Sequence, residues 1–145
     1  MAFIPKGAEW YIAEIVEEIR VDDDPRNVVL RNLTLIRADS PTEAYEKALR
    51  IGKKGEVEYD NPEAKRVRVS FRGISHLDVI PDKLEDGAEL SFQSQHGVSQ
   101  EEIAGILCPK EELDIFRKIR KLDGPDFTSA DVLQEVEDRL KHIQL

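Results

Sequence analysis

Several runs in the first two thirds of the chain alternate between apolar and polar residues with a period of two, which is the pattern of half-buried β-strands. Between the first two runs the chain reads "DDDPRN" (residues 22–27), and the Asp, Pro and Asn residues favour a tight turn. The pair Asp86–Gly87 indicates a second hairpin turn. The predicted strands cover residues 9–21, 28–39, 65–73, 76–80 and 88–94.

The first predicted strand is unusual because it is apolar on both faces. One face carries only apolar residues, namely Tyr11, Ala13, Ile15 and Ile19. The other face mixes apolar and acidic residues, namely Trp10, Ile12, Glu14, Val16 and Glu18. One helix cannot bury both sets. We therefore expect the second face to be covered by the C-terminal helices, first within the same chain and otherwise from a second copy in a homodimer.

The segment 40–54 carries the start and stop signals of a helix. Ser40 is a good N-cap, Pro41 suits the first helical position, and Glu43 completes a capping box. We expect Gly52, followed by two lysines, to end this helix, because glycine adopts the left-handed conformation and cations favour a helix C-terminus.

After Gly97 the pattern changes to helical spacing. Ser99 and Glu102 form a second capping box and predict a short helix. Pro109 is expected to interrupt that helix and to start the next one, in which Leu113, Phe116 and Ile119 lie at helical spacing. A capping-box-like sequence at residues 128–131 predicts the last helix.

Together these elements predict an α+β protein. The order is β-β-α-β-β-β, with a mainly antiparallel sheet of four to five strands and one helix on a face, followed by a helical C-terminal segment. We place an α+β domain in residues 1–95 and assign residues 96–145 to the helical segment, packed on that domain or on a second copy.

Four blocks of sequence resemble a known family. They read "WYIAEIV" from Trp10, "IRADSPTEAYEKALRIG" from Ile36, "VRVSFRGISHLDVI" from Val67 and "LEDGAELSF" from Leu84. In this order they are similar to the bacterial family called domain of unknown function 4288, over about residues 9–93. The resemblance implies a compact α+β domain, and it brings no activity, cofactor or catalytic residue with it.

Composition narrows the class of protein. The 145 residues are 40% hydrophobic and 35% charged, with a net charge of −9, so the chain as a whole repels nucleic acid. Cys108 is the single cysteine, which favours a reducing compartment, and no apolar run resembles a signal peptide or a membrane span. We expect a cytoplasmic protein.

A row of arginines stands out against this acidic background. In "KRVRVSFRG" (residues 65–73), Arg66, Arg68 and Arg72 alternate with apolar residues. If this strand lies beside the first one, the arginines pair with Glu14 and Glu18 across the sheet. The alternative is a face left free for another protein, with Trp10, Glu14, Glu18, Arg66, Arg68 and Arg72 as candidate partner-binding residues.

Few residues suggest chemistry. His76 and Asp78 share one face of a predicted strand, and Cys108 precedes a helix start, although a buried apolar role is the expectation for Cys108. The acidic run at residues 22–24 lacks the ligand spacing of a calcium-binding loop. The cations in "FRKIRK" (residues 116–121) are favourable near a helix C-terminus. We assign no catalytic, cofactor-binding or metal-binding residue.

Three functions follow from these observations. The first is a non-enzymatic protein-interaction module, of which an immunity-like, toxin-neutralising role is a special case. The second is a small ligand-binding domain or hydrolase with a pocket near His76 and Asp78. The third, ranked last because of the net charge, is a nucleic-acid binder that uses Arg66, Arg68 and Arg72.

Overall fold

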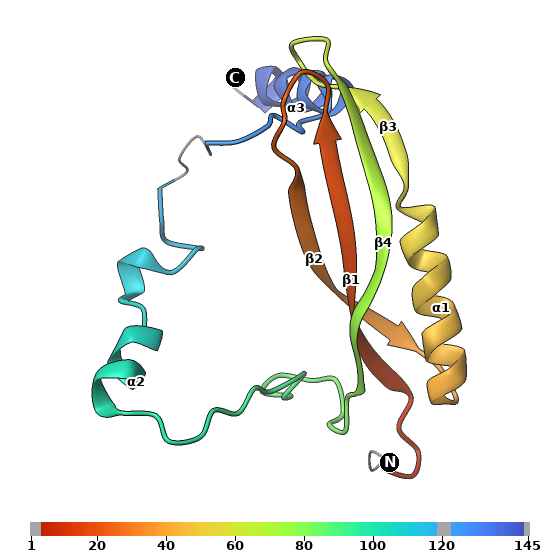
Figure 1. The fold of residues 1–145 in the computed structure, drawn as a ribbon, viewed down its shortest axis with the longest axis vertical. Helices are drawn as coiled ribbons and strands as arrows, with labels where there is room; N and C mark the ends of the chain where they lie inside the picture. Colours follow the sequence, from red (N-terminus) through yellow and green to blue (C-terminus); the bar gives the residue numbers. More distant parts are fainter. Residues whose placement is uncertain (1–3, 119–122, 144–145) are drawn as a thin grey trace. The chain divides into compact units, whose positions relative to one another are not determined.

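A four-stranded antiparallel sheet is the main element of the computed structural model, which describes residues 4–118 and 123–143 (Figure 1). Its strands are β1 (Trp10–Val21), β2 (Val28–Arg37), β3 (Val57–Asp60) and β4 (Arg66–Val79). They are arranged in the order β2-β1-β4-β3, so β1 lies between β2 and β4. The predicted α+β class with a mainly antiparallel sheet is confirmed.

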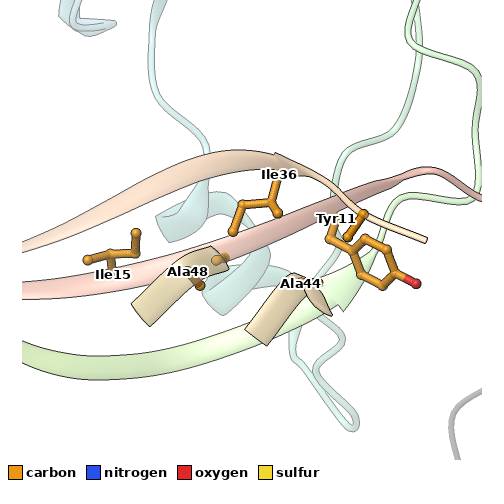
Figure 2. Close-up of a cluster of buried hydrophobic side chains, with 7 residues drawn as sticks. Tyr11, Ile15, Ile36, Ala44 and Ala48 are labelled. Carbon is orange, nitrogen blue, oxygen red and sulfur yellow. The ribbon is translucent and has the colours of Figure 1, made fainter. Parts of the chain in front are cut away.

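Helix α1 (Pro41–Lys54) follows β2 and covers one face of the sheet (Figure 1). Ala44 and Ala48 are completely buried, and they pack against Tyr11, Ile15 and Ile36 (Figure 2). Because alanine has only a methyl side chain, the helix backbone can lie close to the strands, and the larger side chains of the sheet fill the remaining space.

The predicted role of Gly52 is wrong. Helix α1 continues to Lys54, and its C-cap is Gly55, whose φ of −75° is right-handed. Gly52 is buried within the helix, where a Cβ atom would lie 2.3 Å from Cε2 of Phe71 in β4. Glycine is needed here because the Phe71 ring occupies the space of a side chain.

A second buried cluster lies on the same face of the sheet, nearer the β1–β2 turn. It consists of Ile19, Val21 and Val67, against which Phe127 packs from the C-terminal part of the chain. Two side chains of the β3–β4 hairpin also hold that segment. The Tyr59 hydroxyl donates a hydrogen bond to the Phe127 carbonyl, and Nδ2 of the buried Asn61 donates to the Asp126 carbonyl at 2.9 Å.

Three strand predictions are wrong. Residues 65–73 and 76–80 were expected to form two strands, but they form the single strand β4. Residues 57–60 were expected in a loop, but they form β3, which is antiparallel to β4. Residues 88–94 were expected to form the last strand, but they form no strand, and Leu90 and Phe92 are exposed. The alternating pattern is present in both of the last two segments, but only residues 57–60 have a neighbouring strand with which to exchange backbone hydrogen bonds.

The remaining described elements are α2 (Gln100–Ile106), the 3₁₀ turn η1 (Lys110–Glu112) and α3 (Ala130–Ile143). The capping box of Ser99 and Glu102 is confirmed. The helix expected to start at Pro109 is only the 3₁₀ turn η1, and no helix follows it up to residue 118, where the described part ends. None of the described helices is long and apolar enough to cross a lipid bilayer.

The chain divides into two compact units. One comprises residues 1–91 and 124–145, and the other comprises residues 92–123. The first unit contains the sheet, α1 and α3, whereas the second contains α2 and η1. Division at residue 95 stays a prediction.

Candidate protein-interaction surface

Side chains on the face of the sheet opposite α1 form the surface that we call the open face. The strand registers place the following residues on it: Trp10, Ile12, Glu14, Val16 and Glu18 of β1, Val29, Arg31, Leu33, Leu35 and Arg37 of β2, and Arg68, Ser70, His76 and Asp78 of β4. The mixed apolar and acidic face predicted for the first strand therefore lies on the side without α1.

The β2 half of the open face is apolar and exposed. Val29, Leu33 and Leu35 retain 54%, 66% and 48% of their accessible surface, although each is a large hydrophobic residue. Beside them in β1, Ile12 is buried and Val16 is half-buried. Large apolar side chains grouped in this way on a soluble protein are typical of a binding surface.

Two irregularities in the pairing of β1 with β4 add polar groups to this face. The register shifts between Glu14 and Ile15 and again between Val16 and Glu17, which leaves Ser75 and Arg72 without partners in the β1–β4 register. Between them, Gly73 has a φ of 141°, a conformation that residues with a Cβ rarely adopt. Such bulges redirect side chains locally.

Ser75 therefore reaches Glu14. The Ser75 hydroxyl donates to Oε1 of Glu14 at 2.6 Å, and Nε of Arg31 in β2 donates to the same oxygen at 2.5 Å. These two hydrogen bonds, that of Ser75 first, lower the pKa of Glu14 below its ordinary value.

Glu18 is likewise held by a hydrogen bond and an ion pair. Nδ2 of Asn27 donates to its Oε2 at 2.6 Å, and Arg72 lies 3.5 Å from its Oε1. The pKa of Glu18 is lowered, chiefly by the bond from Asn27 and further by the charges of Arg20 and Arg72.

Exposure differs strongly between the two signs of charge. The side chains of Glu14 and Glu18 retain only 15% and 18% of their accessible surface, whereas those of Arg31, Arg37 and Arg72 retain 69%, 66% and 63%. Arg31 and Arg72 neutralise Glu14 and Glu18 and are far more exposed than these carboxylates, whereas Arg37 lies 3.3 Å from the more exposed Glu9. This part of an acidic protein therefore presents arginines to the solvent.

The other two arginines of β4 have different partners. Arg66 lies 3.2 Å from Glu58 and 3.4 Å from Asp60, both in β3. Arg68 pairs with Asp22 of the β1–β2 turn at 2.6 Å and with Glu58. The predicted pairing across β1 and β4 is thus confirmed for Arg72 with Glu18. It is wrong for Arg66 and Arg68, because β3 and the β1–β2 turn supply acidic partners that the prediction did not include.

The residues expected to carry chemistry fall in both compact units. His76 and Asp78 share the open face as predicted, and Oδ1 of Asp78 accepts a hydrogen bond from the N–H of Val79. Cys108 belongs to the unit of residues 92–123, and the expectation that it is buried is wrong, because its thiol is exposed. In the described parts of the chain, no three His, Cys, Asp or Glu side chains are grouped as metal ligands.

The acidic turn and the basic run also have structural partners. Asp23 forms an ion pair with Lys65, and Asp24 accepts hydrogen bonds from Arg26. These contacts stabilise this part of the predicted turn. In "FRKIRK", Arg117 lies 2.7 Å from Asp114. The end of that run, from residue 119, lies outside the described residues.

A hollow of about 550 Å³ lies at the end of the sheet where β1 begins. Residues 5–10 line one side of it and residues 80–84 the other, with Trp10 as its aromatic wall. Neither His76 nor Asp78 lines this hollow, so it differs from the pocket that the ligand-binding hypothesis requires.

The matched part of the protein is an α+β domain. Helix α1 covers one face of its antiparallel sheet, and the other face is apolar and rich in exposed arginines. The chain belongs to the family described as Domain of unknown function (DUF4288), whose profile matches residues 10–91. The match contains all four strands and α1, so the predicted family is confirmed. Comparison with curated proteins and with solved structures found no match.

Proposed function

We propose that this protein is a non-enzymatic interaction module that binds another protein through its open face. The observation that carries the proposal is the exposure of Val29, Leu33 and Leu35 in one row of an edge strand. Burying apolar surface provides about 25 cal/mol per Å² removed from water, so such a row supplies free energy for association.

The charges beside this row define the chemistry of the partner. Arg31, Arg37 and Arg72 extend into solvent around the apolar residues. Arginine forms bidentate hydrogen bonds with carboxylates and is enriched among residues that dominate binding energy. The partner surface should therefore have an apolar strip flanked by Asp or Glu.

Nucleic-acid binding has less support from the geometry. The net charge of −9 repels a phosphate backbone, and Arg66 and Arg68, like the other arginines of this protein's sheet, are already paired with carboxylates. A hydrolase at His76 and Asp78 lacks support as well, because the hollow at the end of the sheet involves neither residue.

The cellular setting is part of the proposal. Cys108 is exposed, and an exposed free thiol in an oxidising compartment would form disulfides with other proteins. This favours a cytoplasmic protein. An immunity-like role fits the proposal because it requires only binding, with no catalytic group.

The test compares two variants as baits for proteins from the native host. Leu33→Thr removes the most exposed apolar side chain of the open face and retains good strand propensity. Tyr45→Ser is the matched control, because Tyr45 is similarly exposed on α1. A protein captured by the wild-type chain is purified and its affinity is measured directly.

We expect Leu33→Thr to weaken that affinity at least tenfold, which is about 1.4 kcal/mol, and Tyr45→Ser to leave it unchanged. Higher salt should weaken binding further, since exposed arginines are screened. Equal affinities for wild type and Leu33→Thr would refute the proposal.

A further inference from the structure

Helix α3 is a second unpartnered apolar surface. Its side chains are exposed from Asp131 to Ile143, including one stripe at helical spacing. The stripe consists of Val132, Val136, Leu140 and Ile143, which retain 56%, 46%, 54% and 74% of their accessible surface. A single helix of 14 residues is marginal in water without a surface to pack on, so α3 requires one.

The start of α3 is fixed on the α1 side of the sheet. Phe127 packs against Ile19, Val21 and Val67, which face the same way as the residues under α1. Tyr59 and Asn61 bind the carbonyls of Phe127 and Asp126. This anchor determines which surfaces α3 can reach.

Only Thr128 and Ser129 separate the anchor from the first residue of α3. Two extended residues span at most about 7 Å. A chain that leads from one side of a sheet to a helix packed on the other side must span roughly 20 Å, because the layer packed on each side lies about 10 Å from the sheet. While the anchor holds, α3 cannot lie along the open face of its own chain, so α3 does not supply the cover within the chain that the sequence led us to expect.

The open face and α3 match in length and in charge. The apolar row from Val29 to Leu35 extends about 20 Å at 3.4 Å per strand residue. The stripe from Val132 to Ile143 extends about 17 Å at 1.5 Å per helical residue. Helix α3 carries more acidic than basic residues, with Asp131, Glu135, Glu137 and Asp138 against Arg139 and Lys141.

We propose that two copies of the chain associate reciprocally, with α3 of each copy lying across β1 and β2 on the open face of the other. This inference rests on the proposed function and names a second copy as the partner. The carboxylates of α3 then meet Arg31, Arg37 and Arg72, and both exposed apolar surfaces are buried. Because the two contacts are identical, the assembly closes as a symmetric dimer.

The experiment uses two full-length variants, studied separately and mixed. Leu33→Asp damages the open face and leaves α3 intact, whereas Val136→Asp damages α3 and leaves the open face intact. Sedimentation velocity over a range of concentrations measures the mass and the dissociation constant. Circular dichroism and thermal melting verify that each variant is folded, and Tyr45→Asp serves as the control for an added charge on another exposed surface.

We expect the wild-type chain and Tyr45→Asp to dimerise. For Leu33→Asp and for Val136→Asp, the dissociation constant of the dimer should be at least tenfold higher. An equimolar mixture of Leu33→Asp and Val136→Asp should recover dimers, because the intact α3 of the first still fits the intact face of the second. Should Leu33→Asp fail to fold, Leu33→Thr replaces it.

Other results would overturn the inference in distinguishable ways. A dimer that survives Val136→Asp indicates contact between two open faces, and one that survives Leu33→Asp indicates contact between two α3 helices. A wild-type chain that stays monomeric also refutes the dimer. In that case the proposed function is tested separately, by whether Leu33→Thr weakens the affinity for the host protein.

Discussion

Replacing Gly52 by Ala tests how α1 is held on its face of the sheet, and therefore why the opposite face is left without a helix. The new Cβ would lie 2.3 Å from Cε2 and 2.4 Å from Cδ2 of Phe71, far closer than two carbon atoms can approach. Either the ring or the helix must move. Since Phe71 packs against the buried cluster beneath α1, movement of either one disturbs that core.

Two opposing terms determine the size of the effect. Alanine is favoured over glycine within a helix by about 0.8–1.0 kcal/mol, whereas overpacking a core costs about 1–3 kcal/mol. We therefore expect Gly52→Ala to lower the free energy of unfolding by about 1 kcal/mol. In a Phe71→Ala background the clash is removed, and the same substitution should raise the free energy of unfolding by about 0.8 kcal/mol.

Urea unfolding, followed by circular dichroism, measures the four proteins of this double-mutant cycle. Comparison within each background removes the cost of Phe71→Ala itself. The decisive result is the change of sign. If Gly52→Ala stabilises the wild-type protein as much as it stabilises Phe71→Ala, the close packing of α1 on β4 is wrong.

Three further predictions concern the hydrogen bonds that hold the β3–β4 hairpin and the open face. Asn61→Ala removes the donor to Asp126 and the acceptor of the N–H groups of Glu63 and Lys65, and it should cost about 2–3 kcal/mol of unfolding free energy in urea titrations. Tyr59→Phe removes a single donor and should cost about 1 kcal/mol in the same assay, so a larger loss than that of Asn61→Ala would contradict the assignment. Ser75→Ala should raise the pKa of Glu14 toward its ordinary value of 4.5 in an NMR titration. Because the folded-state pKa of Glu14 is lowered, its contribution to stability is present above pH 4.5 and disappears as the pH falls through the folded-state pKa, and Ser75→Ala should weaken this acid dependence.

Local signals explain most of what the sequence predicts correctly. The helix at residues 41–54 has an N-cap, a proline at its start and an apolar stripe, all within its own length. The β1–β2 hairpin has a turn between two long alternating runs. Gly52 was misassigned because the space that it leaves is filled by Phe71, a residue distant in sequence.

Information that depends on neighbouring strands is absent from such local patterns. Strand β3 has four residues, too few for its alternation to be distinctive, and its pairing with β4 brings Glu58 and Asp60 to Arg66. The bulges that bring Ser75 and Arg72 beside Glu14 and Glu18 likewise exist only in the paired sheet.

The candidate surface was predicted in part. Trp10, Glu14, Glu18 and Arg72 were expected on a face suited to a partner, and the structure brings them onto the open face. The exposed row of Val29, Leu33 and Leu35 was missed, although these residues alternate with Leu30, Asn32 and Thr34 in the sequence. Their exposure depends on the position of β2 at the edge of the sheet and on the position of α1 on the opposite face.

Methyl NMR spectra of the full-length chain over a dilution series test most directly whether the open face is a binding surface. The account predicts that the methyl signals of Leu33, Leu35 and Leu140 shift together with concentration, because each leaves water when two copies associate. The signals of Ile51, which is exposed on α1, should stay constant. Shifts at Ile51 without shifts at Leu33, or spectra that do not change with concentration, would contradict the reciprocal dimer.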